Sequence, residues 1–325
     1  MNILITGAGG FIGSALCNEL SAQGMKVKAL ARRHVRLAED VEVIIGDLED
    51  TFALSDLLAG IDVVVHLAGR AHQLNESLLN PLELYRKVNR DLTVALAESA
   101  VQAGVKRFVF ISSIGVNGLD TTIEPVNELS VPNPVRDYAI SKFEAEQRLS
   151  YLLEGKMELV IVRPPLVYAA NAPGNFRRLL RLVKLGVPLP FAKVTAKRSM
   201  ISLANLLSFL NVAINHPSAA NQLFLVSDGD DIALPEILEC LASGMQRNIF
   251  LVPVPLQMLR FGMALMRKEM LYKQLCGCFL IDSSKARTLL DWKAPFSAKH
   301  ELLLAARQFM ISSGAETGMG KGSYK

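Results

Sequence analysis

Three residues whose types could exchange a proton with a substrate lie near the middle of the chain. Tyr138 and Lys142, in "DYAISK", are four residues apart and share one face of a predicted helix. Ser113 follows the apolar run "FVFI", at the end of a predicted strand. A phenol is a weak base at neutral pH unless a neighbouring positive charge stabilises its anion, and a hydroxyl can donate to an oxygen that develops charge. A Tyr–Lys pair alone is usually structural, so the surrounding elements decide the interpretation.

The chain begins with a pattern of strand, glycine-rich turn and helix. Residues 3–5 are an apolar run of buried-strand type, and residues 14–23 predict a helix that ends at Gly24. Between them, Gly7, Gly10 and Gly13 fit the spacing G-x-x-G-x-x-G. Such a turn lets backbone N–H groups and the helix N-terminus face a pyrophosphate. We expect a bound dinucleotide here; the alternative is a glycine-rich turn without a ligand.

The first half of the chain alternates strand and helix patterns. Apolar runs at residues 26–30, 41–45, 62–68, 107–113 and 159–165 predict parallel strands, with helical segments such as 91–104 between them. This rhythm predicts an α/β fold with a Rossmann-type doubly wound parallel sheet. The expected dinucleotide-binding domain is residues 1–168, with residues 199–226 returning to it. Residues 169–198 and 227–312 are expected to form a smaller, discontinuous substrate-binding lobe, and residues 313–325 a disordered tail.

Composition narrows the class of protein. Half of the 325 residues are apolar, a fifth are charged, and the net charge of +4 is too small and dispersed to predict a nucleic-acid partner. The four cysteines lack the partners of a zinc site, so no metal is expected. Unpaired thiols without a signal peptide predict a cytoplasmic protein. Prolines and Arg260 interrupt the apolar segment 249–266, so no membrane insertion is expected.

Six short motifs resemble, in order, those of the extended short-chain dehydrogenase/reductases: "TGAGGFIG", "GDL", "HLAG", "ISS", "YAISK" and "RPPLVY". Within that family the chain is similar to the nucleotide-sugar epimerase, dehydratase and reductase branch, up to about residue 310. The resemblance implies that Ser113 is the catalytic serine, Tyr138 the acid/base and Lys142 its partner. It implies a nucleotide-sugar substrate, whose diphosphate contacts Asn175 and Arg198 while Ser113 contacts the sugar, and it is compatible with a homodimer.

The same resemblance implies a set of residues around a nicotinamide cofactor, which are Gly7, Gly10, Phe11, Ile12, Gly13, Asp47, Leu48, Leu67, Ala68, Gly69, Tyr138, Lys142 and Pro165. The chain departs from the family pattern at Asn117, where many relatives have Tyr. It also departs at Lys273 and Gln274, in a region where relatives often place an arginine on the diphosphate.

The end of the second predicted strand indicates which nicotinamide cofactor binds. An Asp or Glu there usually holds a free ribose diol, but this chain has Ala31 followed by Arg32 and Arg33. Two guanidinium groups suit a 2′-phosphate, so we expect NADP, with NAD as the alternative if the arginines are merely solvated.

Cofactor choice bears weakly on the reaction. Reductases consume NADPH, so the sequence favours reduction of an NDP-4-keto-6-deoxy sugar at C4, for surface polysaccharide biosynthesis. The alternative is an NAD-dependent 4-epimerase acting on a UDP-hexose or UDP-N-acetylhexosamine. A third alternative, from another class, is a catalytically silent dinucleotide-binding regulator.

Overall fold

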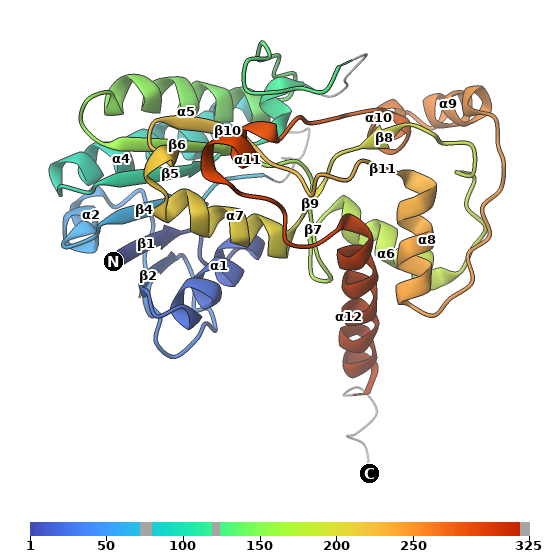
Figure 1. The fold of residues 1–325 in the computed structure, drawn as a ribbon, viewed down its shortest axis with the longest axis horizontal. Coiled ribbons are helices and arrows are strands. Elements are labelled where there is room, and N and C mark those ends of the chain that lie inside the picture. Colours follow the sequence, from blue (N-terminus) through green and yellow to red (C-terminus); the bar gives the residue numbers. More distant parts are fainter. Residues whose placement is uncertain (72–79, 119–123, 319–325) are drawn as a thin grey trace.

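Seven parallel strands form the central sheet, on the left of Figure 1. The structure is a computed structural model that describes residues 1–71, 80–118 and 124–318. The strand order is β3-β2-β1-β4-β5-β6-β10, and each neighbouring pair is parallel. The strands are β1 (Asn2–Thr6), β2 (Lys26–Ala31), β3 (Glu42–Ile45), β4 (Val63–His66), β5 (Arg107–Ile111), β6 (Glu158–Arg163) and β10 (Gln222–Leu225).

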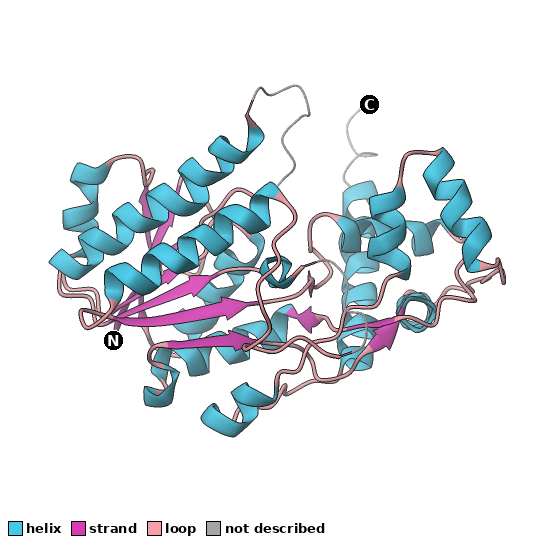
Figure 2. Ribbon diagram, turned by 90° about the horizontal axis from the view of Figure 1, so that it is seen from above, coloured by secondary structure: helices cyan, strands magenta, loops and turns pink. Residues whose placement is uncertain are grey.

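Helices cover both faces of the sheet (Figure 2). Successive side chains of a strand point to opposite faces, so Ile3 and Ile5 join one apolar layer and Leu4 joins the other. Both layers exclude water, which is why the strands are continuous apolar runs. The helices are α1 (Phe11–Ala22) and α7 (Leu203–Asn215) on the first face, and α2 (Thr51–Leu58), α4 (Leu92–Gln102) and α5 (Asp137–Leu153) on the second.

A second apolar core forms the smaller lobe, on the right of Figure 1. Its helices α8 (Leu234–Gly244) and α12 (Ala298–Gly318) approach so closely that a Cβ at Gly244 would lie 2.5 Å from the carbonyl oxygen of Leu303. The lobe also contains α6 (Asn175–Leu185), β8 (Lys197–Arg198), β11 (Ile232–Ala233), α9 (Leu256–Leu265) and α10 (Glu269–Cys276). The parallel pair β7 (Val167–Tyr168) and β9 (Ile201–Ser202) lies between the two cores, because Val167 and Ile201 pack in the core of the sheet domain and Tyr168 packs in that of the lobe. Short elements complete the chain: α3 (Pro81–Arg86), the π-helix η1 (Lys87–Asp91), the 3₁₀ helices η2 (Ile114–Asn117) and η3 (Pro217–Ala219), and α11 (Ser284–Leu290).

The predicted Rossmann-type sheet is confirmed, and the five apolar runs are strands β2 to β6. Two element boundaries differ from the sequence prediction. Helix α1 begins at Phe11 rather than residue 14, because Gly10 already has the extended backbone of an N-cap. Helix α12 continues through residues 313–318, which we expected to be disordered, since extending a formed helix costs far less than starting one. Residues 319–325 lie outside the described residues.

The segment around α11 packs on the sheet domain, although the sequence prediction placed it in the lobe. Leu290 and Trp292 belong to the apolar layer beneath α7. The Trp292 indole contacts the ring of Phe209 edge to face at 5.1 Å, and its Nε1 donates to Ser208 Oγ at 3.2 Å. These contacts with α7 hold the segment on the larger domain.

A buried ion pair joins α5 to β6 and η2. Arg163 Nε and Nη2 donate to the two carboxylate oxygens of Glu146 at 3.0 and 2.5 Å, and both side chains are buried. Arg163 Nη1 donates to Asn117 Oδ1 at 3.0 Å. One guanidinium therefore connects the last residue of η2, the end of β6 and the middle of α5.

We expect Glu146→Gln to destabilise the protein by about 3–5 kcal/mol, because it leaves a buried guanidinium without its counter-charge. Glu144→Gln, on the same helix, is the matched control. Glu144 pairs with Arg86 and Arg90 at a partly exposed site, where such pairs contribute about 1 kcal/mol or less. Urea unfolding of both variants measures the difference, and equal midpoints would contradict the prediction.

Candidate active site

The residues predicted to bind the cofactor lie at the carboxyl edge of the sheet. Parallel strands end at the same edge, so the segments that follow them meet there. The predicted residues follow β1 (Gly7, Gly10, Phe11, Ile12, Gly13), β2 (Arg32, Arg33), β3 (Asp47, Leu48), β4 (Leu67, Ala68, Gly69), β5 (Ser113) and β6 (Pro165). Tyr138 and Lys142 reach the edge from α5.

Close packing explains the glycine spacing after β1. Gly7 has a φ of +72°, and a Cβ on it would lie 2.6 Å from the backbone nitrogen of Ala68, in the segment after β4. A Cβ on Gly13 would collide with the carbonyl oxygen of Gly7. Gly10 N donates to the same oxygen at 2.9 Å. The turn thus brings the start of α1 and the end of β4 together without side chains between them.

The N-terminus of α1 fits the pyrophosphate of a dinucleotide. Its N-cap is Gly10, no side chain caps its first N–H groups, and its first turn has no acidic residue. Free N–H groups and the helix dipole favour an anion at this position. The turn and the helix together suit the predicted cofactor.

Lys142 is buried at the centre of this edge. Its Nζ donates to the backbone carbonyl of Ile111 at 2.9 Å and lies 4.5 Å from the centre of the Phe110 ring. It also borders the segment after β4, because a Cβ on Gly69 would lie 3.4 Å from Nζ. Desolvation lowers the pKa of Lys142 to about 8, so the ammonium remains mostly protonated at neutral pH.

Tyr138 lies one turn earlier on α5 and packs edge to face against Tyr85, with ring centres 6.3 Å apart. Burial, with a smaller contribution from Tyr85, raises the pKa of Tyr138 to about 12. The phenol therefore keeps its proton at neutral pH in the protein alone. Acid/base chemistry at this phenol would require a nearby positive charge that lowers its pKa.

Ser113 is the N-cap of η2, and its Oγ accepts from Gly115 N at 3.1 Å. Since the oxygen accepts from the backbone, the hydroxyl proton is available to a substrate atom. Helix η2 packs on the first turn of α5: a Cβ on Gly115 would lie 3.4 Å from both Ser113 Oγ and the Cβ of Ala139. This contact places Ser113 beside the turn that carries Tyr138.

Asn89 is a buried residue of this region that the sequence analysis missed. Its Oδ1 accepts from Arg70 N at 2.7 Å, and its Nδ2 donates to Arg70 O at 3.1 Å and to Ser141 Oγ at 3.0 Å. Ser141 Oγ donates in turn to the carbonyl of Tyr138 at 2.8 Å. Asn89 lies in the π-helix η1, a rare local form that is often found at functional sites. It fixes the segment after Gly69 against the Tyr–Lys helix.

His66 is a structural residue, because both ring nitrogens are hydrogen-bonded. Nδ1 lies 2.7 Å from Thr6 Oγ1, and Nε2 lies 2.9 Å from Thr93 Oγ1. Desolvation, with a smaller contribution from Lys142, lowers the pKa of His66 to about 3. The imidazole is therefore neutral and bridges β1, β4 and α4.

Arg32 and Arg33 are exposed after β2, beside the glycine turn. A Cβ on Gly9 would lie 3.0 Å from Cγ1 of Val35 and 4.0 Å from the Cβ of Ala31. Neither guanidinium forms an ion pair with a described residue. The position and free charge of both arginines are compatible with an anionic group on the cofactor.

In the smaller lobe, the two predicted diphosphate contacts, Asn175 and Arg198, both contact residues 274–277 at the end of α10. Asn175 Nδ2 lies 3.0 Å from the side-chain amide of Gln274 on α10, and Arg198 Nη2 donates to Gly277 O at 3.0 Å. With its amide oriented to satisfy its neighbours, Gln274 accepts from Arg136 Nη2 and Nη1 at 2.8 and 3.1 Å. Arg136 is the N-cap of α5, so a guanidinium from the Tyr–Lys helix lies where the sequence showed no arginine.

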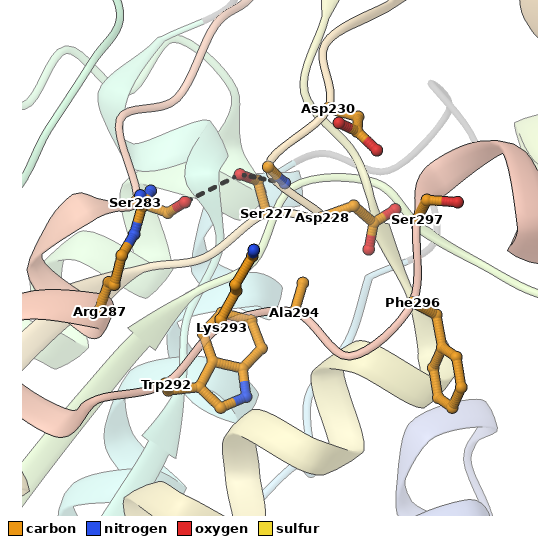
Figure 3. A pocket seen from close by; sticks show the side chains of 11 residues that line it. Ser227, Asp228, Asp230, Ser283, Arg287, Trp292, Lys293, Ala294, Phe296 and Ser297 are labelled. Atoms are coloured by element: carbon orange, nitrogen blue, oxygen red, sulfur yellow. Dashed lines mark hydrogen bonds between the residues drawn. The ribbon is translucent and has the colours of Figure 1, made fainter.

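A separate pocket of about 430 Å³ lies beside α11 (Figure 3) and contains none of the predicted site residues. Its buried Asp228 accepts from Ser202 N at 2.9 Å, Asn205 Nδ2 at 2.6 Å and Tyr168 Oη at 2.7 Å. Burial raises the pKa of Asp228 despite these bonds. The carboxylate therefore ties β7 to the start of α7, which is a structural role.

Comparison with known proteins identifies the family. A model of the NAD dependent epimerase/dehydratase family matches residues 3–226. A UDP-glucose 4-epimerase of Vibrio cholerae is 38% identical over 313 residues, which are 95% of each chain. An N-acetyl-alpha-D-glucosaminyl-diphospho-ditrans,octacis-undecaprenol 4-epimerase of Escherichia coli O157:H7 is 27% identical over 263 residues, 79% of this chain and 77% of the relative.

The crystal structure of UDP-glucuronic acid 4-epimerase from Bacillus cereus in complex with NAD has a similar fold. The TM-score is 0.77 at 22% identity, and the match covers 96% of this chain and 99% of the other. The chain therefore belongs to the NAD-dependent epimerase/dehydratase family of the extended short-chain dehydrogenase/reductases, as its motifs predicted.

Proposed function

We propose that this enzyme interconverts the C4 epimers of a UDP-linked hexose or N-acetylhexosamine and retains its nicotinamide cofactor through each turnover. The observation that carries the proposal is the 38% identity, over 95% of both chains, to a UDP-glucose 4-epimerase. The sequence favoured reduction of an NDP-4-keto-6-deoxy sugar, but that preference rests on Arg32 and Arg33 alone. Epimerisation, the alternative in the sequence analysis, has the stronger support.

The cofactor, when bound, supplies the reversible oxidation of C4, and the residues of the chain manage the proton and the geometry. Tyr138 takes the proton of the substrate 4-hydroxyl and returns it when the C4–H bond is rebuilt. Ser113 donates a hydrogen bond to the same oxygen, and the ammonium of Lys142 stabilises the phenolate.

Epimerisation requires the hydrogen to return to the opposite face of the sugar ring. The sugar must therefore turn over while the rest of the substrate stays bound. Asn175 and Arg198 hold the diphosphate during this rotation, and Arg136 adds positive charge from α5. These contacts lie in the lobe and at the start of α5, so they leave the sugar free to turn at the sheet edge.

A lipid-linked sugar diphosphate is a second candidate substrate, because it has the same glycosyl diphosphate group as a UDP-sugar. The Escherichia coli relative is named for such a substrate. The observation that favours it here is the exposed apolar side chain of Met270, one helical turn before Gln274 on α10. Comparing kcat/KM on a UDP-sugar and on the polyprenyl-diphosphate sugar distinguishes the two substrates.

The proposed reaction makes a direct prediction about absorbance. UDP-glucose and UDP-galactose, or their N-acetyl counterparts, should equilibrate without net change in reduced nicotinamide. Chromatography of the nucleotide sugars, together with absorbance of the same sample, measures both quantities. Oxidation of NADPH in proportion to an added NDP-4-keto-6-deoxy sugar, with no epimer formed from any UDP-sugar, would refute the epimerase and support the reductase.

Tyr138→Phe should lower turnover about 10²–10⁴-fold, because it removes only the proton-transfer hydroxyl. Cofactor binding and thermal stability should stay close to those of the wild type. Tyr151→Phe is the matched control, since Tyr151 lies on the same helix with its ring exposed, and it should keep full turnover. A Tyr138→Phe enzyme that melts early yet keeps its turnover would show that the phenol is structural.

The epimerase alternative implies NAD, whereas the free charges of Arg32 and Arg33 predict tighter binding of NADP, so cofactor preference needs a test separate from that of the reaction. A charge-assisted contact contributes about 1.5–3 kcal/mol, so replacing both arginines by Ala should narrow the preference by at least about tenfold. Arg36→Ala, an exposed arginine of the same loop, is the control. Calorimetry at one salt concentration measures the affinities of each protein for NADP and for NAD. Equal affinities of the wild type for the two cofactors would mean that the arginines are only solvated.

A further inference from the structure

We propose that the outer face of α9 and α10 docks on an anionic phospholipid surface. This outer face is defined by five apolar side chains: Met258, Phe261, Leu265, Met266 and Met270. Figure 1 shows α9 at the end of the lobe that is farthest from the sheet domain. Among the described residues, no helix has the length and apolar character to cross a bilayer, so the contact proposed is peripheral.

The side chains of the outer face are unusually exposed for their type. Met258, Phe261 and Leu265 are 65, 73 and 78% exposed, and Met266 at the end of the helix is 61% exposed. The first three are spaced i, i+3 and i+7, which places them on one stripe of α9. A contiguous exposed apolar stripe on a folded domain is typical of an interaction surface.

The opposite side of α9 is also apolar and is already in contact with the protein. Leu259 is buried in the core of the lobe, and Met263 packs against it. A surface helix normally has polar residues on the side away from the core, whereas this side of α9 presents Met258, Phe261 and Leu265. The outer face therefore lacks its covering layer in the isolated chain.

Positive charge around the outer face indicates what covers it. Residues 256–273 contain four cations and one anion. Arg260, Arg267 and Lys268 are exposed, and none of the three forms an ion pair with a described residue. Apolar side chains with interspersed arginine and lysine are typical of helices that lie in the interface of an anionic membrane.

The same charges disfavour a second copy of this chain as the covering partner. In a two-fold symmetric dimer through this face, each patch meets the identical patch. Arg267 and Lys268, directly after Met266, would then approach the same cations of the other copy, and residues 256–273 of each copy contain one acidic residue, Glu269, to neutralise them. An anionic lipid surface satisfies both the apolar and the charged parts of the outer face.

Docking in this way would bring lipid headgroups close to the predicted diphosphate contacts. Gln274, beside Asn175 and Arg136, lies four residues after Met270 on α10, about 6 Å along the helix axis. Gly277, which accepts from Arg198, follows the same helix. The proposed surface and the candidate active site thus share one helix, although the docking proposal does not depend on the reaction catalysed.

Flotation of the full chain with extruded vesicles tests the proposal. The protein should float with phosphatidylcholine–phosphatidylglycerol vesicles and remain in the dense fraction with pure phosphatidylcholine vesicles. Phe261→Ser with Leu265→Ser should reduce flotation at least about tenfold, since apolar burial drives interfacial binding. Leu185→Ser with Ile311→Ser, two equally exposed apolar positions elsewhere, is the control and should float like the wild type.

A second pair of variants tests the charge. Arg267→Glu with Lys268→Glu should weaken flotation strongly, because each cation near an anionic surface changes binding about fivefold. Reversing exposed Lys26 and Lys156 to Glu gives the same net charge and should have little effect.

Three results would overturn the docking proposal. The first is absence of flotation, and the second is equal flotation with both kinds of vesicle. The third is concentration-dependent self-association of the wild type that Phe261→Ser with Leu265→Ser abolishes. Epimerisation of a soluble UDP-sugar by the same variants, measured in parallel, separates loss of docking from loss of the enzyme.

Discussion

The guanidinium of Arg163 is the interaction on which the geometry of the candidate site depends. It is buried, and it binds Glu146 on α5 and Asn117 at the end of η2. These two elements carry the Tyr–Lys pair and the serine, so this planar cation holds them together in addition to the direct contact between Gly115 and Ala139. Exchanging any of the three partners for an apolar residue would leave a buried polar group unsatisfied, which is costly at this depth.

Burial of charge also explains the protonation states of the site. Burial disfavours the charged form of both groups. It therefore lowers the pKa of the Lys142 ammonium and raises the pKa of the Tyr138 phenol, one helical turn away. The protein alone thus keeps both groups protonated at neutral pH. Burial therefore opposes ionisation of the phenol, and proton transfer at Tyr138 would require a neighbouring positive charge that stabilises the phenolate.

The larger features of this molecule could be predicted from the sequence because they depend on local periodicity. Apolar runs of strand length alternate with helical segments, so the parallel sheet follows. The glycine spacing that begins at Gly7 predicted the turn, and Ser113, Tyr138 and Lys142 follow strands or lie on a helix in recognisable motifs. Because parallel strands end at one edge, the sequence order alone predicted that the glycine turn and Ser113 share that edge.

Tertiary structure decided the contacts between residues that no local pattern links. Asn89 reaches Ser141 only because a π-helix turns it toward α5, and Arg136 meets Gln274 only because the lobe closes on that helix. The exposed apolar face of α9 could not be predicted from the sequence either. Phe261 is a residue type usually buried in a core, and only the folded chain shows that it is exposed. Sequence determines which side chains prefer to leave water. Which of them find a covering partner depends on the packing of distant segments, and only the folded chain shows it.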